Sequence, residues 1–143
     1  MARRYEVNTV LIVEDEPDIQ NFVSRVLELE GYRVLKAGDG NRGLDMLGKN
    51  PVDLLLLDLR LPVRDGWSVL REMKRSPELS KIPVVVITAI AESTQRQKTL
   101  RMGAARYLIK PLSAHKLSKT IAGILRKKAK HFTLADKYAV SNA

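Results

Sequence analysis

Residues 52–66 constrain the fold of this chain more than any other segment. They form the run VDLLLLDLRLPVRDG, in which an apolar stretch ends in a carboxylate, Asp58, and is followed by Pro62 and Gly66. A continuous apolar run bounded by turn residues is typical of a strand buried on both faces of a parallel sheet. Such sheets bind ligands at the carboxyl ends of their strands. Asp58 is therefore expected at the edge of the sheet where open α/β proteins do chemistry.

Strand-like and helix-like segments alternate along the whole chain, which predicts a parallel sheet with helices on both faces. We expect five strands, over residues 8–13, 32–37, 52–57, 82–87 and 106–109. We expect five helices, over residues 17–30, 41–47, 67–75, 92–102 and 113–130. The predicted fold class is α/β, with one five-stranded sheet.

The length of 143 residues suits one domain, expected over residues 1–130, with a poorly ordered tail over residues 131–143. The chain has no cysteine, which excludes disulfides, thiolate metal sites and thiol nucleophiles. Its apolar runs are too short to span a bilayer, and no signal-peptide segment follows Met1. We expect a soluble, cytoplasmic protein without a membrane partner.

The formal net charge of +9 belongs mostly to the C-terminal segment. Residues 1–110 hold 18 Lys and Arg against 15 Asp and Glu, whereas residues 111–143 hold 7 against 1. A solvated helix and tail are the ordinary explanation for such a run. Nucleic-acid binding through the basic segment from Arg126 to Lys130 is the alternative.

Polar residues follow four of the expected strands. Glu14 and Asp15 follow the first strand, Asp58 the third, Thr88 the fourth and Lys110 the fifth. Because the carboxyl ends of parallel strands lie side by side, three acids, a hydroxyl and an ammonium group should converge in one pocket.

Three carboxylates in one pocket repel each other unless a bound divalent cation reverses that cost. Oxygen ligands without Cys or His favour a hard ion, and an open site suits Mg²⁺ better than Ca²⁺. We expect Asp15 and Asp58 to be direct ligands and Glu14 to act through a water.

An aspartate, Mg²⁺, a hydroxyl and a lysine form the set needed to move a phosphoryl group onto a carboxylate. Asp58 would be the nucleophile, while Mg²⁺ and Lys110 would neutralise charge on the phosphoryl oxygens. Thr88 would donate a hydrogen bond to one of those oxygens. Each residue alone has an ordinary interpretation as a cap, strand or loop residue, and their coincidence at successive strand ends favours a site.

Over about residues 8–127 the chain resembles the response-regulator receiver domains of two-component signalling, of the chemotaxis-regulator type. The resemblance rests on four motifs in order. They are VLIVEDE at 10–16, DLRLP at 58–62 with DG at 65–66, VITA at 86–89 and GAARYLIKP at 103–111. It implies a flavodoxin-like (βα)5 fold with strand order 2-1-3-4-5.

The resemblance also implies the chemistry of the site. Asp58 would accept a phosphoryl group from a phosphohistidine on a sensor histidine kinase or phosphotransfer protein, in a reaction that the receiver itself catalyses. Mg²⁺ would be held by Asp15, Asp58 and the backbone carbonyl of Arg60. The product would be an aspartyl phosphate that hydrolyses slowly, so the domain would be a signalling phosphoacceptor and not an ordinary enzyme.

By the same resemblance, Thr88 would follow the phosphoryl group inward, Ala89 would leave room beside it, and Tyr107 would rotate from exposed to buried. The face formed by residues 92–102, 106–109 and 113–130 would then change and bind a downstream protein target. A homodimer through this face is an alternative. The Lys110–Pro111 bond would be cis.

Two enzyme-like alternatives fit the sequence less well. A phosphohydrolase of the haloacid-dehalogenase type needs a second aspartate two residues after the nucleophile, where this chain has Arg60. A nucleotide-binding protein needs a glycine-rich loop after the first strand, where this chain has Glu14, Asp15 and Glu16 instead.

Overall fold

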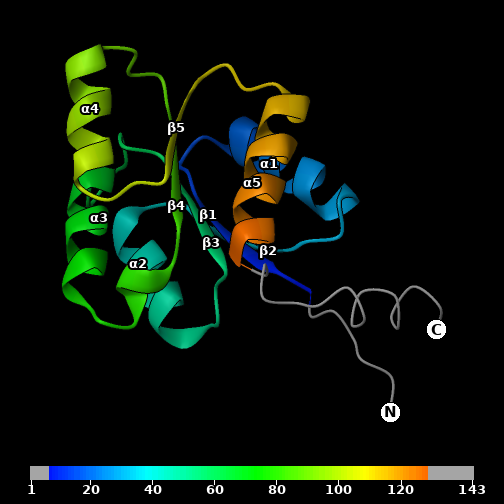
Figure 1. Cartoon of the computed structure of the whole chain (residues 1–143), viewed down its shortest axis with the longest axis horizontal. Helices are drawn as coiled ribbons and strands as arrows, with labels where there is room; N and C mark the ends of the chain where they lie inside the picture. The colour runs from blue at the N-terminus through cyan, green and yellow to red at the C-terminus, as the bar shows by residue number, and fades with distance from the viewer. Residues whose placement is uncertain (1–6, 129–143) are drawn as a thin grey trace.

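A computed structural model describes residues 7–128 of the chain. Five parallel strands form one sheet in the order β2-β1-β3-β4-β5, with helices on both faces (Figure 1). The strands are β1 (Thr9–Val13), β2 (Arg33–Ala37), β3 (Leu54–Leu57), β4 (Val84–Thr88) and β5 (Arg106–Ile109). The helices are α1 (Pro17–Leu29), α2 (Gly40–Lys49), α3 (Gly66–Arg75), α4 (Ser93–Arg101) and α5 (Ala114–Lys128), with a short 3₁₀ helix η1 (Leu79–Lys81). The predicted class and strand order are confirmed.

The element boundaries differ from the expected ones by at most two residues within the described part. β4 begins at Val84 and not at residue 82, because Pro83 has no N–H to give to a neighbouring strand. The strand also runs one residue further than expected, through Thr88. The predicted last helical residues 129–130 and the predicted tail 131–143 lie outside the described residues.

The three central strands are buried along their whole length because helices cover both faces of the sheet. Alternate residues of β1 enter two separate apolar clusters: Leu11 and Val13 pack with α2 and α3, whereas Val10 and Ile12 pack with α1 and α5. This burial fixes the register of β1, since a shift by one residue would exchange the two sets. None of the described helices is long and apolar enough to cross a membrane.

The loop from β3 to α3 is held close to the end of its strand. Asp65 caps α3, because its Oδ1 accepts a hydrogen bond from the amide of Ser68 at 2.9 Å. The amide of Gly66 donates to the carbonyl of Leu59 at 2.8 Å. A Cβ at position 66 would lie 2.2 Å from the carbonyl oxygen of Asp58, so only glycine fits this close approach.

Candidate functional site

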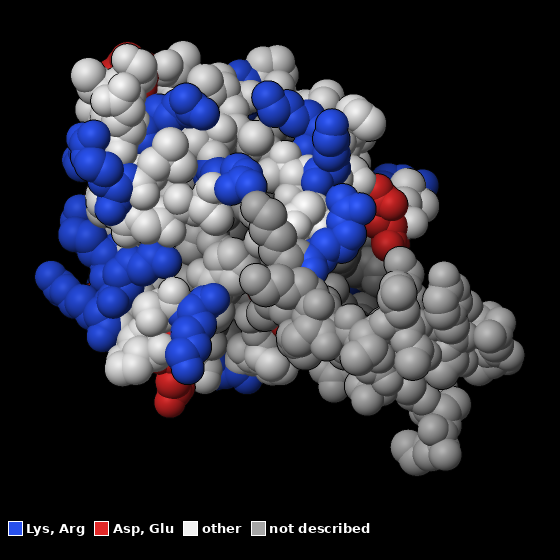
Figure 2. All heavy atoms as spheres, viewed as in Figure 1, with Lys and Arg blue, Asp and Glu red and all other residues white. Residues whose placement is uncertain are grey.

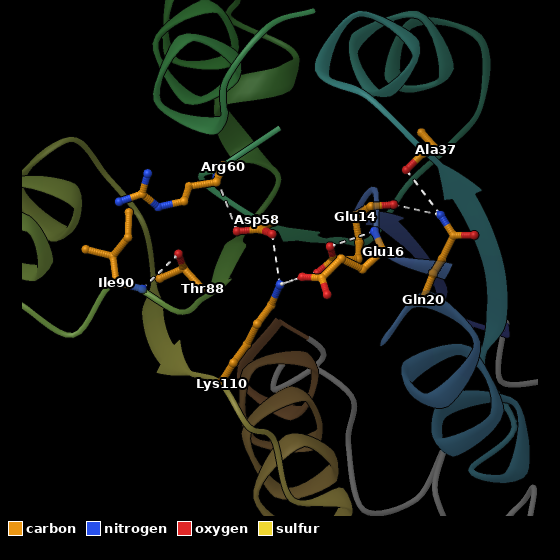
Figure 3. A network of polar contacts seen from close by, with 9 residues as sticks. All are labelled: Glu14, Glu16, Gln20, Ala37, Asp58, Arg60, Thr88, Ile90 and Lys110. Atoms are coloured by element: carbon orange, nitrogen blue, oxygen red, sulfur yellow. Dashed lines mark hydrogen bonds and ion pairs between the residues drawn. The ribbon is translucent and has the colours of Figure 1, made fainter. Parts of the chain in front are cut away.

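Four of the five expected polar side chains lie together at the carboxyl edge of the sheet (Figure 3): Glu14, Asp58, Thr88 and Lys110. The sheet's hydrogen bonding continues just past the strand ends and fixes the backbone there. The amide of Asp58 donates to the carbonyl of Val13 at 3.0 Å, and the amide of Lys110 donates to the carbonyl of Thr88 at 2.8 Å. The positions of these side chains therefore follow from strand pairing.

Asp58 lies at the centre of the site and is only 3% exposed. Its Oδ2 accepts a hydrogen bond from Lys110 Nζ at 2.9 Å. Its Oδ1 accepts a longer one from the backbone amide of Arg60 at 3.2 Å. Both carboxylate oxygens are thus oriented by donors, and the carboxylate is kept in one position.

Lys110 contacts three carboxylates at once. Its Nζ lies 2.7 Å from Glu14 Oε1, 2.9 Å from Asp58 Oδ2 and 3.3 Å from Glu16 Oε1. Burial by itself would lower the pKa of Lys110, but the hydrogen bonds and charges of Glu14 and Asp58 outweigh it and raise that pKa. The side chain is therefore a permanent cation. The Lys110–Pro111 peptide bond is cis, as predicted.

Glu14 is a fully buried carboxylate. Burial raises its pKa, and the nearby charge of Asp58 adds to this, while contacts with Lys110 and the Glu16 amide lower it; the net pKa is raised. Its Oε2 accepts from the Glu16 amide at 3.1 Å. Its Oε1 lies 2.7 Å from Lys110 Nζ in the ion pair and contacts no other donor among the described residues. This buried oxygen retains the capacity to bind a further cation.

The pocket has the donor atoms for a metal ion. One carboxylate oxygen each from Glu14, Glu16 and Asp58 lie within 4.8 Å of one another. Such all-oxygen donors suit a hard divalent cation, and the free acceptor capacity of Glu14 Oε1 fits the same conclusion.

Glu16 belongs to this group, although the sequence analysis gave it no role. Its signal was its place in the same acidic run, two residues after Glu14. Asp15, which we expected to be a direct ligand, is exposed and is not a member of the group. The direct ligation by Asp15 and by the Arg60 carbonyl stays a prediction.

On the other side of Asp58, two side chains hold the segment that leads into α4. Thr88 is fully buried, and its Oγ1 accepts from the amide of Ile90 at 3.3 Å. Tyr107 is also buried, and its hydroxyl donates to the carbonyl of Ile90 at 2.8 Å. Burial, followed by the charge of Glu92, raises the pKa of Tyr107 and keeps the phenol protonated. The resemblance implies an exposed and a buried position of the Tyr107 side chain, and the structure shows the buried one.

The remaining predicted residue, Ala89, follows Thr88 directly and is exposed. The structure thus brings Glu14, Asp58 and Lys110 into direct contact, as the strand ends predicted. Thr88 lies on β4, which pairs with β3, the strand that Asp58 follows directly.

Fold and site together define a doubly wound parallel α/β protein with an acidic pocket and a buried lysine at the strand ends. Comparison with known proteins identifies the family. A model of the response regulator receiver domain matches residues 10–122, and the chain belongs to this family.

Curated relatives include the transcriptional regulatory protein CpxR of Escherichia coli, which is 34% identical over 121 residues, or 85% of this chain and 50% of CpxR. The chain spans about half or less of the length of the first curated relatives it matches.

Solved structures give the same result. A response regulator from Chloroflexus aurantiacus has a TM-score of 0.80 at 29% identity, covering 84% of this chain and 98% of that one. The receiver domain of the sensor histidine kinase PA1611 from Pseudomonas aeruginosa has a TM-score of 0.75 at 32% identity, covering 85% and 97%. The PA1611 structure has a magnesium ion coordinated in its active site cleft. Receiver domains thus occur both in response regulators and in histidine kinases.

Proposed function

We propose that this domain is the phosphoacceptor of a two-component phosphorelay in the cytoplasm, and that Asp58 accepts the phosphoryl group. The observation that carries the proposal is the buried Asp58 carboxylate, hydrogen-bonded to Lys110 and bordered by two further acids that suit a cation. The donor is a phosphohistidine on a sensor histidine kinase or a phosphotransfer protein.

In the proposed step an oxygen of Asp58 attacks the phosphorus atom. The bond from phosphorus to the donor imidazole breaks, its electron pair stays on the nitrogen, and an aspartyl phosphate forms. Lys110, already held next to Asp58, is placed to neutralise charge on the phosphoryl oxygens. Thr88 supplies a hydroxyl from the neighbouring strand.

Mg²⁺ is the proposed cation. It would be held by Asp58 and the Arg60 carbonyl, together with Glu14, Glu16 or Asp15. When bound, Mg²⁺ would neutralise phosphoryl charge and orient the group. The same residues make the domain a self-catalysing signalling module with slow autodephosphorylation.

The hydrogen bonds of Ile90 offer a route by which phosphorylation of Asp58 would alter the structure around Tyr107. Its amide is bound by Thr88 and its carbonyl by Tyr107. If Thr88 turns toward a phosphoryl group, its contact with the Ile90 amide changes, and Tyr107 on β5 is affected through the same residue. We propose that this alters the face formed by α4, β5 and α5, which binds the output partner.

A hollow of about 470 Å³ beside the site offers a surface for the donor protein. It is lined by Ile19 and Phe22 of α1 together with Lys110, Pro111 and Leu112. Phe22 is 43% exposed, although it is a large apolar side chain. A partner docked there would contact Lys110 and lie next to Asp58.

The test is incubation with Mg²⁺ and acetyl phosphate, followed by intact mass measurement. We expect one added phosphate on the wild type and none on Asp58→Asn. Asp45→Asn, which changes an exposed carboxylate of α2, is the matched control and should be labelled like the wild type. Labelling that persists in Asp58→Asn, or that needs no divalent cation, would refute the proposal.

A further inference from the structure

Most cations of this domain are surface groups, and Arg64 is an exception. Figure 2 shows Lys and Arg side chains spread over one face of the molecule. Among the Lys and Arg residues up to position 126, whose exposure the structure describes, only Arg64, Lys74 and Lys110 are not exposed. Lys110 belongs to the acidic pocket, while Arg64 lies in the loop between β3 and α3, which begins at Asp58. A partly buried cation in the loop that carries the proposed phosphoacceptor needs an explanation.

Arg64 holds its loop against the start of α2. Its Nε donates a hydrogen bond to Asn41 Oδ1 at 2.7 Å, and its Nη1 donates to Ser68 Oγ at 3.3 Å. The backbones also approach closely, since a Cβ at position 40 would lie 2.1 Å from the Arg64 carbonyl oxygen. Both hydrogen-bond partners are neutral, so the guanidinium acts through the fixed geometry of its donors and not by pairing with a charge. One side chain therefore joins the loop to α2 and to α3.

The loop that Arg64 holds contains a strained turn. The amide of Arg64 donates to the carbonyl of Pro62 at 2.7 Å, which closes a three-residue turn around Val63. Val63 has a φ of 69°, a conformation that is unfavourable for a β-branched residue, and turns of this kind are rare. Because Val63 is 76% exposed, packing of its side chain compensates little. A strained conformation persists only where the surrounding structure fixes it, and the two side-chain hydrogen bonds of Arg64 supply such a restraint.

The same loop orients the phosphoacceptor. The Arg60 amide donates to Asp58 Oδ1 at 3.2 Å, and the Arg60 carbonyl is a predicted ligand of the cation. The amide of Gly66 donates to the carbonyl of Leu59 at 2.8 Å, so the two ends of the loop are joined to each other. A displacement of Arg64 would therefore be passed to the backbone of Arg60.

We propose that Arg64 is a positioning residue for the cation site. By holding the loop against α2, it keeps the backbone of Arg60 in the arrangement that contacts Asp58. This inference rests on the proposed function, because it concerns the cation that the proposed reaction uses. A cation that binds only the closed loop has an apparent dissociation constant equal to its intrinsic constant divided by the closed fraction. Releasing the loop therefore weakens cation binding.

The test is binding of Mn²⁺ to the full chain, measured from the electron paramagnetic resonance signal of the free ion. Mn²⁺ prefers the same oxygen ligands as Mg²⁺. Arg64→Met should raise the dissociation constant by about tenfold, as is typical for residues that orient metal ligands without binding the metal. Removing a positive charge near an acidic pocket would by itself strengthen cation binding, so the expected loss has the opposite sign to a charge effect. Unchanged or tighter binding would overturn the proposal.

Two variants on α2 show whether the contact with Asn41 is responsible. Arg42→Met removes the same charge from an exposed residue beside Asn41, and should leave Mn²⁺ binding within about twofold of the wild type. Asn41→Ala removes the acceptor without changing the charge, and should weaken binding in the same direction as Arg64→Met. Combined, the two changes should be less than additive, because both remove one hydrogen bond. Equal weakening in Arg42→Met, or full additivity, would refute the assignment.

The strained turn supplies a test that a merely structural role of Arg64 would not meet. Glycine adopts positive φ without the steric cost of valine. Val63→Gly, introduced into the Arg64→Met chain, should therefore restore most of the lost Mn²⁺ affinity. Hydrogen exchange should show the Arg60 amide exchanging faster in Arg64→Met, with the β1 amides unchanged. No recovery with Val63→Gly, or faster exchange throughout the sheet, would show that Arg64 does not act by holding this loop.

The inference and the proposed function fail in different ways. If acetyl phosphate labels Asp58 but Arg64→Met binds Mn²⁺ as tightly as the wild type, only the inference fails. If Arg64→Met weakens Mn²⁺ binding but Asp58 is never labelled, only the proposed function fails. A wild-type chain that binds no Mn²⁺ would refute both.

Discussion

The carboxylate of Glu14 has no exposed surface and lies near a second carboxylate, that of Asp58. Both carboxylates form an ion pair with the same lysine, Lys110. Its raised pKa means that burial and the repulsion from Asp58 outweigh its contact with Lys110. A functional site is a common place for such an unfavourable arrangement, since the charges are kept there for binding.

We predict that Glu14→Gln increases the free energy of unfolding at neutral pH in metal-free buffer, measured by urea denaturation. The amide keeps the shape of the side chain while removing a charge that folding disfavours. Glu16→Gln is the control: Glu16 is 61% exposed, and its change should be small. A lower stability of Glu14→Gln would show that the ion pair with Lys110 dominates.

The pH dependence of this difference has a definite sign. The pKa of Glu14 is raised on folding. Its contribution to the free energy of unfolding is therefore favourable below the pKa it has in the unfolded chain, and is lost as the pH rises through the pKa it has in the folded protein. The gain from Glu14→Gln should therefore be present at neutral pH and shrink as the pH falls toward the ordinary range of a glutamate. A gain that grows on acidification would contradict the assignment.

Gly66 is the residue whose substitution should disturb the site most directly by sterics. An added Cβ would lie 2.2 Å from the Asp58 carbonyl oxygen and 2.7 Å from Leu59 Cα, both rigid backbone atoms. We predict that Gly66→Ala destabilises the domain by about 1–3 kcal/mol, since the α3 N-terminus must move. Gly48→Ala, within α2 and with nothing within 4 Å, should instead stabilise by about 0.5–1 kcal/mol. Chemical denaturation of both variants checks the contrast.

Among the α-helices, α4 has the fewest buried residues to hold it: only Thr99 is buried. The side chain of Glu92 at its N-terminus makes no capping hydrogen bond. Trp67 Nε1 donates to Thr99 Oγ1 at 3.0 Å, and that hydroxyl donates to the carbonyl of Gln95 at 2.7 Å. Lys98 Nζ lies 5.1 Å from the centre of the Trp67 ring. The first turn of α3 thus anchors α4.

We predict that Thr99→Val speeds hydrogen exchange of the α4 amides by about fivefold, as expected for the loss of a hydrogen bond worth about 1 kcal/mol. Amides of β1 and β3 should be unaffected. Thr99→Ser keeps the hydroxyl and should leave the exchange rates of the α4 amides closer to those of the wild type. If exchange increased equally throughout the sheet, Thr99 would be supporting the whole fold and not α4.

The elements themselves were largely predictable, because apolar runs, prolines and glycines mark each strand and helix along the sequence. The convergence of Asp58 and Lys110 followed from the parallel sheet alone. The anchoring of α4 was not predictable, since Trp67 and Thr99 are 32 residues apart and nothing local indicates their hydrogen bond. The place of Glu16 in the pocket was missed because its role depends on side-chain direction and not on strand order.

At the scale of the whole molecule, cation binding in the acidic pocket would be coupled to folding. A cation that binds the folded site and not the unfolded chain stabilises the fold according to its concentration. We predict that Mg²⁺ at about a hundredfold excess over its dissociation constant adds about 2.7 kcal/mol to the free energy of unfolding. Thermal unfolding with Mg²⁺ and with a chelator measures this. The increase should be much smaller in Asp58→Asn, and an equal increase there would place the ion elsewhere.

Trp67 is the only tryptophan of the chain, and it lies between the loop that follows Asp58 and α4, the α-helix with the fewest buried residues. Any displacement of α4 must change the surroundings of this one indole. The unlabelled protein therefore contains its own optical reporter, and the emission of a single chromophore can follow activation in real time.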